Sequence, residues 1–252
     1  MPDACPVFAT GAAYRRYLSK VQDLAPIFSE FGLMKYRVEV ECCWVLFLSQ
    51  CPGIEEFATL SEDDQAYVQA IADTFDAQSA ARIKAFEATT NHDVKAVEYF
   101  LKEAFAERPT LQAMNEWIHF GCTSEDINNT AYGLMIKNAR DAVLPRMQTL
   151  IDALDALATA NADLPMLSRT HGQTASPTTL GKEIKNVAAR LERQRQQVQN
   201  TPLLGKFNGA VGNFNAHLAA YPNLDWAALS EQFIASLGLQ NNVGGMARSN
   251  GA

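Results

Sequence analysis

The spacing of apolar residues along the chain predicts helices and no strands. Two runs are long and strongly periodic, over residues 126–160 and 177–202, and in both the apolar positions recur every three or four residues. The first carries Val143, Met147, Leu150, Ile151, Leu154 and Leu157, and the second carries Leu180, Ile184, Val187, Leu191 and Val198. Pro145 lies inside the first run and predicts a bend or a break, since proline lacks the helical N–H. No stretch alternates apolar and polar residues as a strand does, so the pattern predicts an all-α fold.

Shorter helices are expected elsewhere. Their ranges are 22–49 with a break near Gly32, 61–75 opened by the capping sequence at Ser61, 77–89, a helix starting at Asn91, and 226–237. Residues 1–20 hold Pro2, Pro6 and Gly11 and are expected to be irregular. We therefore expect an N-terminal helical domain over residues 1–111, followed by part of a long-helix bundle over residues 112–252.

Composition narrows the class of protein. The chain has 252 residues, of which 48% are hydrophobic, and this argues against disorder. Its net charge of −7 argues against nucleic acid as the main partner, but it is compatible with a phosphorylated small molecule bound in a local cationic pocket. No apolar run approaches the roughly 20 residues that a membrane span needs. Five cysteines, including Cys5, form neither a CxxC pair nor a zinc spacing, which predicts free thiols, no metal site and a cytoplasmic location.

Two polar clusters stand at predicted helix starts. In the first, Asn91 is expected to cap a helix and Asp93 to complement its dipole, which leaves His92 unexplained. In the second, Thr123 or Ser124 is the expected cap, and the free N–H groups of such a helix start favour a carboxylate or a phosphate. The nearby His119 is expected to pack beside the aromatic residues that flank it rather than to act in catalysis.

A third cluster lies between the two long helical runs. It reads Ser168-Arg169-Thr170-His171-Gly172-Gln173-Thr174-Ala175-Ser176-Pro177. Ser176 and Pro177 fit a helix cap and a first helical position, and His171 just ahead of them could exchange a proton with a ligand near neutral pH. The alternative is an ordinary polar loop with a structural histidine.

Two further segments have weaker signals. Arg15 and Arg16 beside Tyr17 could hold a phosphate, although such clusters are more often plain solvated surface. The glycine-rich segment 205–217 lacks the spacing of a phosphate-binding loop and is expected to serve close packing or a tight turn.

Taken together and in this order, the motifs are far more specific than each is alone. They are Thr90-Asn91-His92-Asp93-Val94-Lys95, Cys122-Thr123-Ser124-Glu125-Asp126-Ile127-Asn128-Asn129, Ser168-Arg169-Thr170-His171-Gly172-Gln173 and Gly205-Lys206-Phe207-Asn208-Gly209-Ala210-Val211-Gly212-Asn213. The set resembles the adenylosuccinate lyase family of the fumarase/aspartase superfamily from about Arg16 to Gln240. The resemblance implies a helical, fumarase/aspartase-like fold that assembles into homotetramers.

The resemblance also implies a reaction. Adenylosuccinate would be split into AMP and fumarate, and SAICAR into AICAR and fumarate, by a β-elimination in purine biosynthesis that needs no cofactor. His171 would be the general acid and His92 its support. The substrate-binding residues would be Arg16, Tyr17, Asn91, His92, Asp93, Thr123 and Ser124.

This chain departs from the family pattern at both ends. The turn that precedes Arg16 in the family differs here, and the run after Gln240 does not match. The family's serine loop, which carries the catalytic base, and its C-terminal helical domain have no counterpart in these residues. We therefore expect a chain truncated before the serine loop. The alternative function is that of a catalytically inactive helical fragment that binds nucleotide or associates with full-length subunits.

Overall fold

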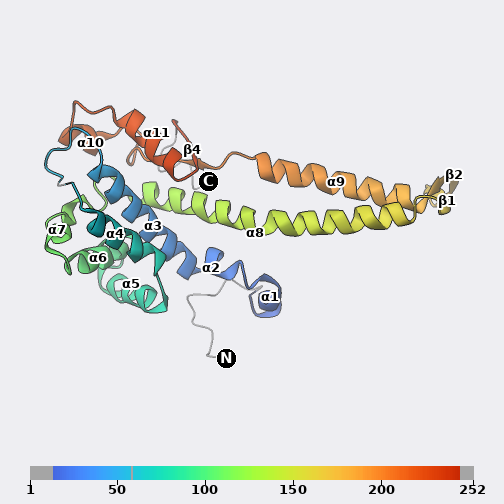
Figure 1. Cartoon of the computed structure of the whole chain (residues 1–252), viewed down its shortest axis with the longest axis horizontal. Helices are drawn as coiled ribbons and strands as arrows, with labels where there is room; N and C mark the ends of the chain where they lie inside the picture. Colours follow the sequence, from blue (N-terminus) through green and yellow to red (C-terminus); the bar gives the residue numbers. More distant parts are fainter. Residues whose placement is uncertain (1–13, 58, 245–252) are drawn as a thin grey trace. The chain divides into compact units, whose positions relative to one another are not determined.

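The computed structural model describes residues 14–57 and 59–244, without the side chains of residues 14–16 and 18. The described chain is mostly helical, which confirms the predicted class (Figure 1). It divides into two compact units. The first contains the described residues up to Lys137 and those from Leu203 onward, and the second is Asn138–Pro202.

The first unit holds most of the helices. They are α1 (Tyr14–Val21), α2 (Ala25–Phe28), α3 (Glu30–Ser49), α4 (Glu62–Asp73), α5 (Ala77–Thr90), α6 (Asp93–Phe105), α7 (Pro109–Gln112), a 3-10 helix (Asn115–Trp117), the first part of α8 (Ser124–Ala160), α10 (Asn215–Ala220) and α11 (Trp226–Ser236). The strands β3 (Leu204–Gly205) and β4 (Gln240–Asn241) pair in parallel. The expectation that residues up to 20 are irregular is wrong from Tyr14 on, because α1 forms there with Lys20 at its negative C-terminal end.

Helix α3 is the centre of the first unit. It packs against α4, α5 and α6, and Val38, Val40 and Val45 on it are fully buried. The Trp44 ring contacts Phe207 and Phe233, which come from far along the sequence. Burying each such large side chain contributes roughly 1.5–3 kcal/mol. A rigid helix at the centre of the core can hold the loops around it in fixed positions.

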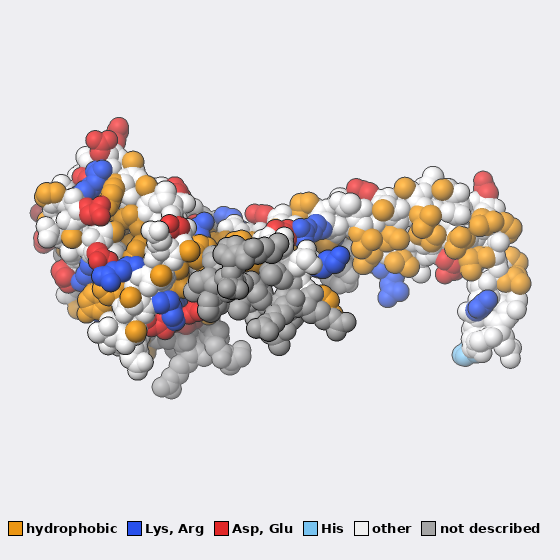
Figure 2. Space-filling view, turned by 90° about the horizontal axis from the view of Figure 1, so that it is seen from below, with side chains coloured by type: hydrophobic (Ala, Val, Ile, Leu, Met, Phe, Trp, Pro, Cys, Tyr) orange, Lys and Arg blue, Asp and Glu red, His pale blue; other side chains and the backbone are white. Residues whose placement is uncertain are grey.

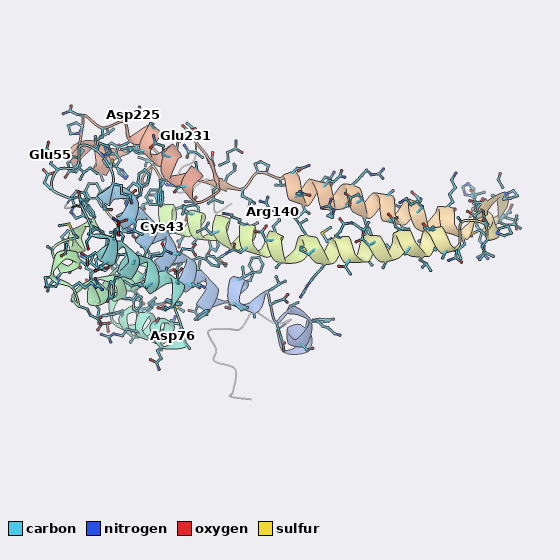
Figure 3. All side chains as sticks on the ribbon, in the orientation of Figure 1. Cys43, Glu55, Asp76, Arg140, Asp225 and Glu231 are labelled. Atoms are coloured by element: carbon cyan, nitrogen blue, oxygen red, sulfur yellow. The ribbon has the colours of Figure 1, made fainter. Side chains whose placement is uncertain are left out.

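Several helix starts follow the predicted capping chemistry. Ser61 accepts a hydrogen bond from the N–H of Asp64, so the expected cap of α4 is confirmed. Asp76 caps α5 and Asp225 caps α11 in the same way (Figure 3). The break expected near Gly32 lies at Ser29 instead, because the Ser29 hydroxyl accepts the N–H of Gly32 and starts α3 there.

The second unit is a helical hairpin with a β-hairpin at its turn. It comprises the rest of α8, the strands β1 (Pro165–Thr170) and β2 (Gln173–Thr179), and α9 (Leu180–Asn200). Helix α8 continues through Pro145 without a break, and it ends at Ala160 as predicted. Arg140 on α8 donates hydrogen bonds to the carbonyl oxygens of Gln199 and Thr201 at the end of α9 (Figure 3).

The β-hairpin corrects the expected helix start at Ser176 and Pro177. Both residues lie in β2, and α9 begins three residues after Pro177 with the Thr179 hydroxyl accepting the N–H of Lys182. A proline is tolerated in an edge strand, where its missing N–H breaks no central ladder. Ser176 followed by Pro177 therefore fits a position in strand β2 as well as a helix start.

Hydrophobic side chains remain on the surface of the second unit. Leu150, Leu157 and Val187 are about half exposed, and orange side chains gather along the α8–α9 hairpin (Figure 2). None of the described helices combines the length and the apolar character required to traverse a bilayer.

Candidate functional site

The turn between α5 and α6 carries the first motif. Asn91 ends α5 with a left-handed backbone (φ 53°), and His92 caps α6 by accepting the N–H of Lys95 at Nδ1, 3.1 Å away. The expectation that Asn91 is the helix cap is therefore wrong. Asparagine tolerates the left-handed conformation better than most residues, which suits it to the end of α5. With Nδ1 accepting, a neutral His92 carries its proton on Nε2, and half of its side chain is exposed.

Arg37 on α3 connects the first motif to the second. Its guanidinium donates to Asp93 Oδ2 at 2.6 Å and to Asn128 Oδ1 at 2.9 Å, and the residue is buried. Partial burial would raise the pKa of Asp93, but the charge and hydrogen bond of Arg37 and the N–H of Val94 lower it. Asp93 is thus held ionised, and the starts of α6 and α8 are tied to one buried side chain.

The second motif forms the start of α8, as predicted. The helix begins at Ser124, and the Asp126 carboxylate accepts the N–H of Thr123 at 2.8 Å. An acid three residues into a helix that bonds back to the preceding N–H is the second half of a capping box. Thr123 and Ser124 are half-buried at the positive end of this helix dipole, where an anion is favoured.

The glycine-rich segment 205–217 contacts the start of α8 through Asp126. Lys206 Nζ lies 2.8 Å from Asp126 Oδ1, and both side chains have no exposed surface. The N–H groups of Asn208 and Gly209 also donate to Asp126. The Asn129 side-chain oxygen Oδ1 accepts a hydrogen bond from the backbone N–H of Lys206. The segment therefore serves packing, as expected, and it does so around a buried ion pair.

His119 is a feature that the sequence reasoning missed. Its imidazole does not simply pack beside the flanking aromatic residues. Nδ1 lies 2.6 Å from Glu41 Oε1, the backbone N–H donates to Glu41 Oε2 at 3.0 Å, and Nε2 lies 4.0 Å from Glu98 Oε1. Burial opposes a charge on the ring, but Glu41 and then Glu98 outweigh it and raise the pKa of His119 above its ordinary value. No local signal singles out its partner, because Glu41 is one of several charged residues on α3, which also carries Lys35 and Glu39.

The third motif lies in the second unit. His171 and Gly172 are the two central residues of the turn that joins β1 to β2, and their φ angles are 52° and 77°. Positive φ at both positions is what the tight two-residue turns of β-hairpins require, and Gly172 meets that need without strain. The turn holds the His171 side chain exposed, and no hydrogen bond to it occurs among the described residues.

The predicted residues are thus distributed over both units. The first unit brings together Asn91, His92 and Asp93 with the start of α8, whereas His171 belongs to the second. Tyr17 lies in α1 and is half exposed. The side chain of Arg16 lies outside the described part of the chain.

No described residues gather in a way that would coordinate a metal with three or more His, Cys, Asp or Glu side chains. A groove of about 670 Å³ lies in the second unit, between the end of α8 and the start of α9. None of the predicted site residues lines it. The ionisable residues that line it are Lys182, Glu183 and Lys185, and none of them belongs to the motifs.

Comparison with protein families and known proteins gives one consistent result. A family model described as "Lyase" matches residues 15–246. Adenylosuccinate lyase of Escherichia coli (strain K12) is 55% identical over 228 residues, which cover 90% of this chain and 50% of the relative. Adenylosuccinate lyase of Vibrio cholerae is 56% identical with the same coverage. The chain therefore spans about half the length of these relatives.

Solved structures show the same fold. A 3-carboxy-cis,cis-muconate lactonizing enzyme from Pseudomonas putida aligns with a TM-score of 0.68 and 25% identity, covering 88% of this chain and 48% of that one. A fumarate lyase from Mesorhizobium sp. BNC1 aligns with a TM-score of 0.67 and 23% identity, covering 87% and 48%. The predicted fumarase/aspartase-like architecture is confirmed.

Proposed function

This chain belongs to the lyase family whose model it matches over residues 15–246, and we propose that it supplies part of the active site of an adenylosuccinate lyase-type enzyme. The reaction would release fumarate from adenylosuccinate to give AMP, and from SAICAR to give AICAR, in cytoplasmic purine biosynthesis. The proposal rests on the likeness to the relatives and on the geometry of the motifs.

The elimination divides into two proton transfers. A base removes a proton from the succinyl Cβ, the C–N bond breaks with its electron pair leaving on nitrogen, and the new double bond belongs to fumarate. In this proposal the His171 imidazole donates a proton to the departing nitrogen, because imidazole is the side chain that most often serves as a general acid or base. The base would be the serine of the family loop, which has no counterpart in these residues.

The substrate would be held mainly by polar groups at helix starts. The dipole and the hydroxyl groups at Thr123 and Ser124 suit a succinyl carboxylate. His92 offers its Nε2–H and also supports His171, while Asn91 and Asp93 complete the pocket. Arg16 and Tyr17 are proposed to meet the nucleotide phosphate, for which a guanidinium is well shaped.

One observation carries this assignment. Arg37 donates hydrogen bonds to Asp93 and Asn128 at the same time, so one residue from each of the two motifs is held by a single buried side chain. A network of this kind pre-organises polar groups for a ligand. These contacts support the proposal for the part of the site at the starts of α6 and α8.

Binding of nucleotide to the purified chain tests the proposal. Adenylosuccinate, which carries the succinyl group, is titrated into the wild type, Thr123→Val and His92→Ala by calorimetry. Loss of a charge-assisted hydrogen bond should weaken binding about tenfold in each variant. Thr74→Val, at the exposed end of α4, is the matched control and should bind as the wild type does. Equal affinity in all four proteins would contradict the assignment.

Assembly with further copies is part of the proposal. The exposed leucines on α8 and the groove beside α9 are typical of helix faces that pack against other helices. We propose a homotetramer in which one site draws on several subunits, and a domain boundary near residue 111. Light scattering after size-exclusion chromatography should show oligomers, and a stable monomer would count against this part.

A further inference from the structure

Glu41 is a carboxylate in the middle of the first unit's core. It lies on α3 and has no exposed surface. The hydrogen bonds recorded for its side chain are the two from His119, one from the backbone N–H and one from the ring. A buried carboxylate is stable as an anion only with a hydrogen-bonded partner of opposite charge. The partner recorded here is an imidazole, which provides that charge only when it is protonated.

The backbone at His119 is shaped to reach Glu41. Its φ is 61°, an unusual value for a residue other than glycine. This conformation places the backbone N–H and Nδ1 on the same carboxylate, one on each oxygen. One contact holds the backbone of His119 and the other holds the Nδ1 edge of its ring, so the orientation of the opposite edge, Nε2, is fixed.

The surrounding charges come from two helices. Glu41 faces the ring from α3, and Glu98 and Lys95 face it from α6. Lys95 Nζ forms an ion pair with Glu98 Oε2 at 2.6 Å, and the backbone N–H of Lys95 donates a hydrogen bond to His92 Nδ1. A chain of contacts therefore joins His92 of the first motif to His119, which lies four positions before Thr123 of the second.

We propose that Glu41 is a positioning residue that locks the Nδ1 edge of His119 and keeps the imidazole protonated, so that Nε2–H is a fixed cationic donor beside the starts of α6 and α8. This rests on the proposed function, because the donor would serve an anionic group of a nucleotide bound there. Glu41 itself would touch no substrate and would act only through His119.

Titration of the histidine ring signals by NMR tests the proposal in the 252-residue chain. The protein has four histidines, so each signal can be assigned by single substitutions. The wild-type His119 midpoint should lie above about 6.5, and Glu41→Gln should lower it by at least about one pH unit. Glu98→Gln is the matched control, because it removes a carboxylate whose oxygen lies 4.0 Å from His119 Nε2. This variant should lower the His119 midpoint less than Glu41→Gln does. Glu41→Asp keeps the charge and should restore much of the midpoint.

The same midpoint in the wild type and in Glu41→Gln would overturn the proposal. Should Glu41→Gln fail to fold, the ring nitrogen shifts of the wild type decide, because a His119 ring that is mainly neutral at about pH 6.5 would also overturn the proposal.

Titration with adenylosuccinate then separates this inference from the proposed function. A lowered midpoint with about tenfold weaker adenylosuccinate binding supports both, whereas a lowered midpoint with unchanged affinity overturns the positioning role. If the wild type binds no adenylosuccinate, the proposed function fails, while the midpoints still decide whether Glu41 sets the charge of His119.

Discussion

Replacing Lys206 with methionine should strongly destabilise the first unit, because it leaves the buried carboxylate of Asp126 without its cation. The two charged atoms are 2.8 Å apart and neither side chain has exposed surface. Methionine has a similar length, so the main loss is the charge and its hydrogen bonds. The carbonyl oxygen of Gly209 also loses its donor.

The size of the effect follows from the contacts that remain. Removing one partner of a buried pair costs about 3–5 kcal/mol. Asp126 keeps three backbone N–H donors, from Thr123, Asn208 and Gly209, and these place the expected loss near the lower end, at about 3 kcal/mol. The double variant Asp126→Asn with Lys206→Met should lose less than the sum of the two single variants, because the second change removes the uncompensated charge.

Urea unfolding followed by tryptophan emission is the suitable assay. The protein has three tryptophans, Trp44, Trp117 and Trp226, and all lie in the first unit, so the signal reports on that unit alone. With a denaturant slope of about 2 kcal/mol/M, the midpoint should fall by about 1.5 M.

Lys102→Met is the matched control for this experiment. It removes an ion pair with Glu116, whose side chain is 90% exposed, and should cost no more than about 1 kcal/mol. If Lys206→Met destabilises the unit no more than Lys102→Met does, the view of the buried pair as a support of the α8 start is refuted.

Three other outcomes are expected in the first unit. Burial among aromatic rings lowers the pKa of His217 to about 4, so below about 6.5 the unfolded chain takes up a proton that the folded chain does not. Stability should fall by up to roughly 3 kcal/mol between about pH 6.5 and pH 4, and His217→Phe should flatten that part of a urea-derived stability curve. Gly121→Ala should lower the melting temperature, since φ is +70° and a Cβ would lie 2.5 Å from the His217 ring; an unchanged value would contradict the packing. Arg37→Met should speed amide hydrogen exchange at the starts of α6 and α8, and unchanged exchange at both would disprove the link.

Local signals predicted the helical parts of the fold well. The end of α8 at Ala160 and the cap at Ser61 were both foreseeable, because helical periodicity and capping residues act within a few positions of the chain. The hydrophobic pattern of the sequence does not predict the hairpin of β1 and β2. Much of its two strands is exposed, so no apolar alternation marks them, and Pro177 fits a helix start as well as an edge strand.

The site was only partly visible in the sequence. The motifs at His92, Thr123 and His171 stood out, because clustered polar residues interrupt the apolar pattern. Asn91 was given the wrong structural role, since asparagine suits both the start and the end of a helix. The pairing of Glu41 with His119 spans 78 positions, and only the folded chain brings the two together.

The release of fumarate by a chain extended to the full length of its relatives tests the central claim most directly. The 252-residue chain should cleave adenylosuccinate negligibly, and the extended chain should be active. His171→Ala in the extended chain should lower kcat by about 10² to 10⁴-fold while changing KM little, because the proton reaches the leaving nitrogen in the transition state. An unchanged kcat in that variant, or robust turnover by the 252-residue chain, would contradict the account.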